Sequence, residues 1–262
     1  AIPLPENFDD VPGPLHPAKV RVIRKRFERF GYEGHDLSTE AGWRRLRAQY
    51  FGLCSQVDTH LGRILRRLTQ TGQEGNTIVV FTSDHGDMMG SHRLLAKGVR
   101  YQESVRIPLM VRLPGQRTGR RMTGPFSQVN LVPTLLDMMG VGGQEGMHGR
   151  SVRGVLEGGG TDVGEDVLVQ WNIRGSTEEE EMARGIAPWM LEAEPDERRI
   201  VASFGDNWRM IVSPEGWKYT QSQAGEDELY DLKRDPLERR NLAFEAAYAG
   251  VVAELRGRLA RK

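Results

Sequence analysis

The stretch that decides the fold reads Thr77-Ile78-Val79-Val80-Phe81-Thr82-Ser83-Asp84-His85-Gly86-Asp87. Its first five residues are apolar or β-branched, which predicts a buried β-strand. The residues that follow bring two carboxylates and an imidazole to the carboxyl end of that strand, where ligands collect in α/β sheets. Neighbours in a regular strand point to opposite faces, so a turn must let Asp84 and His85 reach one ion. We expect Gly86 to supply that turn through backbone angles that other residues avoid. The sequence therefore predicts a metal site, with an Asx-type turn that merely closes the strand as the alternative.

A long amphipathic helix is predicted directly upstream of this strand. Between Thr39 and about Gln70, apolar residues recur every three or four positions. They are Trp43, Leu46, Tyr50, Leu53, Val57, Leu61, Ile64 and Leu68. Ser38 or Thr39 can cap the start of the helix, and Gly72 can end it. Because helix, turn and strand in this order form half of a βαβ unit, the pattern favours a parallel sheet.

The pattern of elements changes near residue 160. Before it, a second strand is predicted over Ile107–Leu113 and a helix over Asn130–Met139. Beyond it, the sequence predicts short strands and one final helix, at Val167–Trp171, Trp208–Val212, Trp217–Thr220, Glu228–Tyr230 and Glu245–Leu259. We therefore expect residues 1–160 to belong to a larger α/β domain and residues 161–262 to form a small α+β subdomain with an antiparallel sheet.

Two further segments are rich in turn-forming residues or lack periodicity. Residues 1–18 are rich in Pro and Gly, which predicts an extended arm that lies on another part of the protein. Residues 172–200 show no clear pattern and are expected to be irregular.

Composition narrows the classes of partner. The chain has 262 residues, of which 38% are apolar and 27% charged, so it can bury a substantial core. Its 36 basic and 36 acidic residues leave no net field, and we expect neither nucleic acid nor an anionic membrane as a partner. No stretch approaches the roughly 18 to 20 apolar residues of a membrane span. The single cysteine, Cys54, favours a reducing compartment such as the cytoplasm, and its place in the long helix predicts a packing role.

Three separated stretches of the chain share the motifs of a known family. The first is Asn76–His92 with Lys97 and Tyr101–Leu109, the second is Pro133–Asp137 with Gly149–Ser151, and the third runs from Glu228–Leu232 through Asp235-Pro236 to Asn241-Leu242. In order and spacing they resemble the sulfatase family of the alkaline-phosphatase superfamily. The resemblance implies an alkaline-phosphatase-like α/β sandwich, with the second half of its main sheet in this chain, followed by the small α+β subdomain.

The resemblance also implies a part of the active site that this sequence lacks. In that family the nucleophile is a formylglycine made from the Cys or Ser of a C-x-P-S-R type motif, and two aspartates near the N-terminus hold the metal from the other side. Cys54 lacks the Pro and Arg of that motif. The chain therefore looks like the C-terminal portion of a sulfatase, whose partners would be the missing N-terminal portion and a sulfate ester substrate.

The resemblance assigns roles to residues of the first stretch. Asp84 and His85 would hold a divalent metal, for which calcium is expected because a carboxylate is a hard ligand. Many sulfatases resemble this pattern with Asn in place of His85, and an imidazole suits manganese or zinc better. Lys97 matches the lysine that contacts the sulfate and the bridging oxygen, so it would neutralise the leaving group. His92 is expected to act with Lys97 as a donor to substrate, or else to be a loop histidine bonded to backbone. Asp87 is expected to orient His85 or to cap the next turn.

Three functions remain open from the sequence. The leading hypothesis is a sulfuric ester hydrolase that uses metal-assisted hydrolysis. A phosphonate or phosphodiester hydrolase of the same superfamily would use the same half site, by which we mean the part of the active site that this chain carries. A histidine at position 85 also resembles the pattern of those enzymes. A non-catalytic fragment that folds and binds is the third. If strands of the sheet come from elsewhere, this chain should expose an apolar edge.

Overall fold

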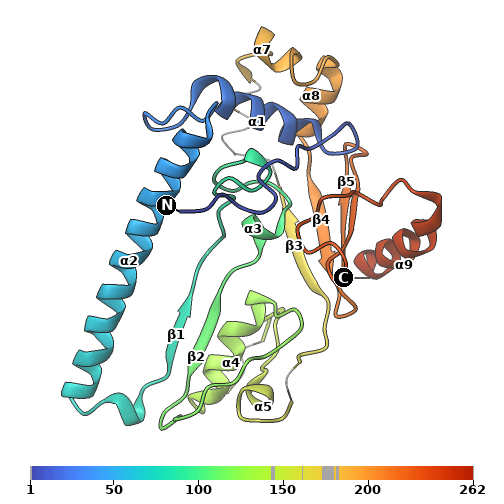
Figure 1. Ribbon diagram of the computed structural model, residues 1–262. Helices are drawn as coiled ribbons and strands as arrows, with labels where there is room; N and C mark the ends of the chain where they lie inside the picture. Colours follow the sequence, from blue (N-terminus) through green and yellow to red (C-terminus); the bar gives the residue numbers. More distant parts are fainter. Residues whose placement is uncertain (1, 143–144, 161, 173–179, 181–182, 262) are drawn as a thin grey trace. The chain divides into compact units, whose positions relative to one another are not determined.

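The computed structural model describes residues 2–142, 145–160, 162–172, 180 and 183–261, and it divides into two compact units (Figure 1). The first unit comprises Ala1–Gly119 with Ser176–Phe204, and the second comprises Arg120–Gly175 with Gly205–Lys262. The chain thus passes between the units three times rather than once near residue 160. The domain boundary expected at that position remains a prediction.

The described part of the first unit contains both long and short helices. They are α1 (Ala18–Phe30), α2 (Glu40–Gln70), α3 (Gln102–Val105), α7 (Pro188–Leu191) and α8 (Glu197–Phe204), with short 3₁₀ turns η1 (Glu74–Asn76) and η2 (Ser91–Arg93). The predicted long helix is confirmed as α2. The Thr39 hydroxyl accepts the N–H of Gly42 at 3.1 Å, which is the expected N-cap, and Gly72 follows the helix with a φ of 70°.

The predicted N-terminal arm lies on the start of α2. Phe8 is buried in a cluster with Leu37, Trp43, Leu46, Met89 and Leu95. The Phe8 ring meets the Trp43 ring edge-on, with centroids 5.8 Å apart. The guanidinium groups of Arg44 and Arg47 donate to the carbonyls of Ile2 and Pro3, at 3.2 and 3.0 Å. The arm is therefore part of the core of the first unit.

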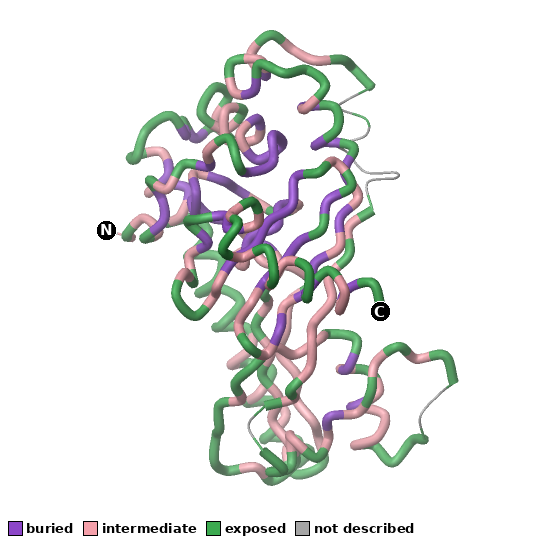
Figure 2. The backbone as a smooth tube through the Cα atoms, turned by 90° about the vertical axis from the view of Figure 1, so that its right-hand side faces the viewer, coloured by how far each residue is buried: buried purple, intermediate pink, exposed green. Residues whose placement is uncertain are grey.

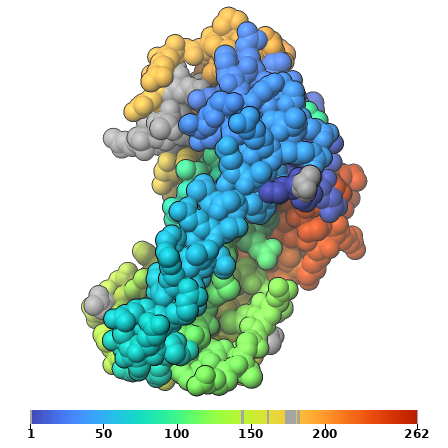
Figure 3. Space-filling view, turned by 60° about the vertical axis from the view of Figure 1, so that its left-hand side comes forward, coloured from blue at the N-terminus to red at the C-terminus, as the bar shows by residue number. Residues whose placement is uncertain are grey.

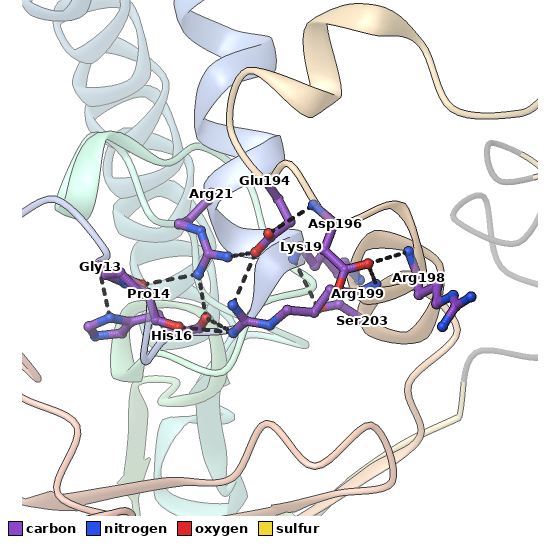
Figure 4. A network of polar contacts seen from close by, with 10 residues as sticks. All are labelled: Gly13, Pro14, His16, Lys19, Arg21, Glu194, Asp196, Arg198, Arg199 and Ser203. Carbon is purple, nitrogen blue, oxygen red and sulfur yellow. Dashed lines mark hydrogen bonds and ion pairs between the residues drawn. The ribbon is translucent and has the colours of Figure 1, made fainter.

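The segment expected to be irregular contains two helices where the structure describes it. Helices α7 and α8 pack against α1, where Val22 is buried with Met190, Ile200 and Phe204. Figure 4 shows the polar contacts of this junction, in which the largely buried carboxylate of Glu194 pairs with the guanidinium groups of Arg21 and Arg199. The expectation of irregular structure was wrong because Arg21 and Val22 of α1 lie more than 150 residues earlier in the sequence, outside any local pattern.

The strands of the first unit form a two-stranded sheet. β1 (Val79–Thr82) pairs with β2 (Leu109–Arg112) in antiparallel register, with Val79 opposite Arg112 and Thr82 opposite Leu109. The parallel sheet favoured by the sequence is therefore not formed by the described residues. A βαβ unit needs a strand before α2, and residues 2–39 contain only an isolated bridge between Tyr32 and His35.

The second unit contains the small antiparallel sheet that was expected. Its strands β3 (Val167–Trp171), β4 (Trp208–Val212), β5 (Trp217–Ser222) and β6 (Glu228–Asp231) are hydrogen-bonded in that order. Its helices are α4 (Leu131–Met138), α5 (Arg153–Leu156) and α9 (Ala249–Ala260), with 3₁₀ turns η3 (Gln128–Asn130) and η4 (Ala246–Tyr248). Leu255 and Leu259 of α9 are buried against Ile211 and Tyr219 of the sheet. The α+β arrangement predicted from the strand spacing is thus confirmed.

Burial differs sharply between the two sheets. Strands β4 to β6 are largely buried, whereas neither β1 nor β2 contains a fully buried residue (Figure 2). In the part of the chain that the structure describes, no helix has the length and apolar composition that crossing a membrane requires.

Most of α2 is exposed although it carries an apolar stripe. Only Trp43 and Leu46 of the helix are buried. Figure 3 shows α2, coloured light blue to cyan, along the face of the molecule that is in view. The exposed apolar residues of the helix are Tyr50, Phe51, Leu53, Val57 and Ile64, which are 37% to 65% accessible. Cys54 is exposed as well, so the packing role expected for it was wrong. A stripe of this kind is typical of a surface that other protein covers.

We expect the isolated chain to self-associate through this stripe, because burying it removes apolar surface from water. Light scattering should give a mass above the 29.5 kDa of one chain, and Leu53→Glu combined with Ile64→Glu should shift it toward the monomer. Gln56→Glu adds the same side chain at an exposed polar position of α2 and serves as the control. A wild-type chain that is monomeric at micromolar concentrations would contradict the expectation.

Candidate metal and substrate site

The candidate site begins where β1 ends. The Thr82 hydroxyl donates to the carbonyl of Pro108 at 2.9 Å, which holds the last residue of the strand beside β2. The Ser83 hydroxyl then donates to the carbonyl of His85 at 2.8 Å, so the chain turns within three residues. The residues from here to Gly98, which we name the site loop (residues 83–98), carry all the side chains to which the sequence assigned chemistry.

Asp84 is held as an exposed, ionised carboxylate. Its Oδ1 accepts the N–H of His85 at 2.9 Å and the Ser83 hydroxyl at 3.3 Å, while its side chain is 85% exposed. The hydrogen bond from the His85 N–H is the main reason why the pKa of Asp84 lies below its usual value, and the aspartate's own N–H adds to this effect. The carboxylate is therefore available as an anionic ligand.

His85 presents Nε2 to that carboxylate. Its Nδ1 lies 2.8 Å from the carbonyl oxygen of Gly86, which can only accept, so Nδ1 carries the hydrogen. In the neutral ring Nε2 then has a free lone pair, and it lies 3.6 Å from Oδ2 of Asp84. In that form the lone pair of Nε2 and the carboxylate of Asp84 would both be able to bind one cation, with metal bonds of about 2.0–2.5 Å, whereas a protonated ring would pair with the carboxylate directly. The chemistry of this pair fits a divalent ion.

Gly86 is required for a different reason from the one expected. Its N–H donates to the carbonyl of Ser104 at 2.9 Å, and a Cβ on it would lie 1.9 Å from the carbonyl oxygen of Glu103. Its φ is not positive. The glycine therefore permits close approach to the backbone of α3 rather than a left-handed turn.

Asp87 caps the site loop. Its Oδ1 accepts the N–H groups of Met89 and Ala96, each at 3.0 Å, which ties the two sides of the loop together. This is the capping role that the sequence offered as one of two options. It places the carboxylate inside the loop rather than on a metal.

Lys97 lies at the accessible end of the loop. It is exposed and sits between Ala96, with a φ of 63°, and Gly98, with a φ of 86°. Among the described residues no carboxylate pairs with its ammonium group. The side chain is therefore free to meet an anionic substrate.

His92 lies inside the protein, unlike Lys97. It is 2% exposed, its Nδ1 lies 3.0 Å from the carbonyl of Asp10, and its Nε2 lies 3.2 Å from the amide nitrogen of Asn7. Both ring nitrogens are thus bonded within the chain. These contacts match the alternative of a loop histidine bonded to backbone, and the role expected for His92 as a donor to substrate stays a prediction.

Among the described residues, the site loop carries the two side chains predicted to bind metal, Asp84 and His85, and the exposed Lys97. No group of three or more His, Cys, Asp or Glu side chains is placed to hold an ion within the part of the chain described. The sequence analysis missed Asn7 and gave Glu103 no role. In the structure, the side chain of Asn7 contacts both His92 of the site loop and Glu103. No local signal could have identified Asn7, which is 85 residues away from His92.

Comparison with known proteins supports the family resemblance found in the sequence. The profile of the sulfatase family matches residues 15–141. The multifunctional alkaline phosphatase superfamily protein PehA of Trinickia caryophylli is 31% identical over 92% of this chain and 45% of its own length. An arylsulfatase of Clostridium perfringens is 30% identical over 81% of this chain and 39% of its own length.

A solved structure shows the same fold. The phosphonate monoester hydrolase SpPMH from Silicibacter pomeroyi superposes with a TM-score of 0.77 and 26% identity over 99% of this chain and 50% of that protein. The chain thus spans about half the length of the proteins it matches. The alkaline-phosphatase-like α/β fold expected from the sequence is confirmed, and the chain belongs to the sulfatase family of the alkaline-phosphatase superfamily.

Proposed function

We propose that the protein containing this chain is a sulfuric ester hydrolase. The observation that supports this most directly is the pair formed by Asp84 and Nε2 of His85, exposed at the end of β1 with an accessible Lys97 on the same loop. Asp84 and His85 would hold a divalent ion, calcium being our first expectation and manganese or zinc the alternatives. The ion would stabilise negative charge on the sulfuryl oxygens.

The residues of this chain would act on the leaving group and the anion. Lys97 would donate to the bridging oxygen as the ester bond breaks, so that the alcohol leaves as a neutral species. We further propose that the nucleophile comes from outside these 262 residues, since Cys54 lies on α2 without the Pro and Arg of the family motif. The single cysteine also supports a reducing compartment, and we propose the cytoplasm.

A phosphonate or phosphodiester hydrolase is the second candidate. The imidazole of His85 favours it, and so does the similarity of this chain to SpPMH, which is named a phosphonate monoester hydrolase. Both reactions need the same cationic surroundings for a transferred anionic group, so the half site serves either.

Paired substrates separate the two candidates. We expect the gene product that contains this chain to hydrolyse 4-nitrophenyl sulfate with a higher kcat/KM than 4-nitrophenyl phenylphosphonate. Lys97→Ala should lower the sulfatase kcat/KM by about 100-fold or more, since a charge-stabilising donor of this kind is typically worth 10²–10³. The exposed Lys233→Ala in the second unit is the matched control. A higher kcat/KM for the phosphonate would favour the second candidate, and turnover by the isolated chain would refute an external nucleophile.

A further inference from the structure

Asn7 belongs to the N-terminal arm, yet it contacts both sides of the candidate site. It is 1% exposed, and its side-chain nitrogen lies 3.2 Å from Nε2 of His92 and 3.0 Å from Oε1 of Glu103. Its carbonyl accepts the N–H of His92 at 3.1 Å. A single side chain of the arm thus joins the site loop to the backbone segment on which Gly86 rests.

The contacts of Asn7 determine the protonation pattern of His92. The carbonyl of Asp10 can only accept, so the hydrogen of the ring is on Nδ1. The carboxylate of Glu103 also only accepts, so the Asn7 atom facing it is the NH₂ group. The second hydrogen of that NH₂ group points to the unprotonated Nε2 of His92. Amide orientation and imidazole tautomer therefore fix one another.

His92 needs such contacts because its backbone is strained. Its φ is 53°, a left-handed conformation that is unfavourable for a non-glycine residue. The ring stacks on Tyr101, with centroids 4.2 Å apart and planes 22° apart. The left-handed turn at His92 brings the N–H of Gly90 to the carbonyl of Leu94 at 2.8 Å, and the chain then runs directly to Lys97.

We propose that Asn7 is a positioning residue for Lys97, acting through His92 and Glu103. By holding the ring in one tautomer and the turn in its left-handed form, it fixes the path of the site loop between His92 and Lys97. The inference rests on the function proposed above for Lys97. It gives the N-terminal arm a part in the reaction without contact between the arm and the substrate.

The first test uses this chain alone and needs no activity. Asn7→Ala removes the donor to Nε2, and the near-isosteric Asn7→Asp also sets a second carboxylate beside Glu103. We expect ¹⁵N NMR of the imidazole to show the neutral Nδ1–H form of His92 in the wild type and loss of that single form in both variants. Amide exchange at Leu94–Gly98 should quicken at least tenfold. Glu6→Gln, an exposed change on the same arm, is the control. Unchanged tautomer and exchange in a folded Asn7→Ala variant would overturn the proposal.

The second test measures turnover of a sulfate ester by the gene product that contains this chain. Asn7→Ala should lower kcat by about 10- to 100-fold, because misplacement of a catalytic group by about 1 Å can cost 10²-fold. KM should change little, and the loss should be larger for an alkyl ester than for 4-nitrophenyl sulfate, which needs less help with its leaving group. In a Lys97→Ala background Asn7→Ala should add nothing.

Each outcome of the second test has a distinct meaning. Additive losses in the double variant, or equal losses for both esters, would overturn the link from Asn7 to Lys97. Absence of sulfatase turnover in the wild-type gene product would instead count against the proposed function, while the NMR and exchange measurements still decide whether Asn7 holds the loop.

Discussion

Asp84→Ala is expected to lower the kcat/KM of sulfate ester hydrolysis by about 100- to 10,000-fold in the gene product that contains this chain. The carboxylate is exposed and ionised beside Nε2 of His85, so it would supply the negative charge that this pair offers to a cation. Metal ions contribute several kcal/mol to transition states of this kind, and each 1.36 kcal/mol corresponds to tenfold in rate. Metal content, measured by inductively coupled plasma mass spectrometry after dialysis, should fall together with turnover.

A substitution at the second ligand distinguishes the ions. His85→Asn replaces an imidazole by an amide oxygen, which calcium accepts and zinc accepts poorly. We expect this variant to keep more activity with calcium than with manganese or zinc. The activity of the wild type should depend less on which of the three ions is supplied. Asp58→Ala, an exposed carboxylate on α2, is the control for loss of one negative charge. Full metal content and full turnover in Asp84→Ala would show that the pair does not hold the ion.

Lys218→Ala is expected to destabilise the second unit by about 3–5 kcal/mol, since removing one partner leaves the other charge buried. The Lys218 ammonium pairs with the carboxylate of Glu238, and the two side chains are 0% and 1% exposed. The ammonium also lies 5.6 Å from the centroid of the Tyr230 ring. Native-state hydrogen exchange of the amides of β5 and β6 measures the free energy of opening this unit by itself.

Two further variants separate the ion pair from simple packing. Replacing both partners, as in Lys218→Met with Glu238→Leu, should be less destabilising than Lys218→Ala because no unpaired charge remains. Arg234→Met removes the cation of an exposed pair with Asp231, 3.7 Å apart, and should cost less than about 1 kcal/mol. A loss below 1 kcal/mol in Lys218→Ala would mean that the pair contributes little to the second unit.

Local sequence patterns predicted most of the elements. The apolar stripe from Trp43 to Leu68 predicted α2, because residues three or four positions apart lie on the same face of a helix. Strands β3 and β4 agree with the predicted bounds, and Pro214-Glu215-Gly216 forms the turn between β4 and β5, with Gly216 at a φ of 93°. These features depend on neighbours within one helical turn or one hairpin, so they can be read along the chain.

The predictions from the sequence were wrong where residues far away in the chain determine the local structure. Residues 172–200 were expected to be irregular, but Glu194 pairs with Arg21 of α1, and helices α7 and α8 pack on α1. Gly86 was expected to adopt backbone angles that other residues avoid. In the structure, a glycine is needed there because a Cβ would clash with the carbonyl oxygen of Glu103. The parallel sheet failed because the only strand partner of β1 among the described residues comes after it in the chain and runs the other way.

The sequence by itself determined which residues could carry chemistry. The run from Thr82 to Asp87 placed a carboxylate and an imidazole at the end of a strand, since a strand and the turn after it are short-range structures. Only the tertiary structure decided how those residues are used. It buries His92 between Asn7, Asp10 and Tyr101, and it leaves Lys97 exposed on the same loop. The physical reason is that burial and hydrogen-bond partners are set by residues more than 80 positions away, which no local pattern records.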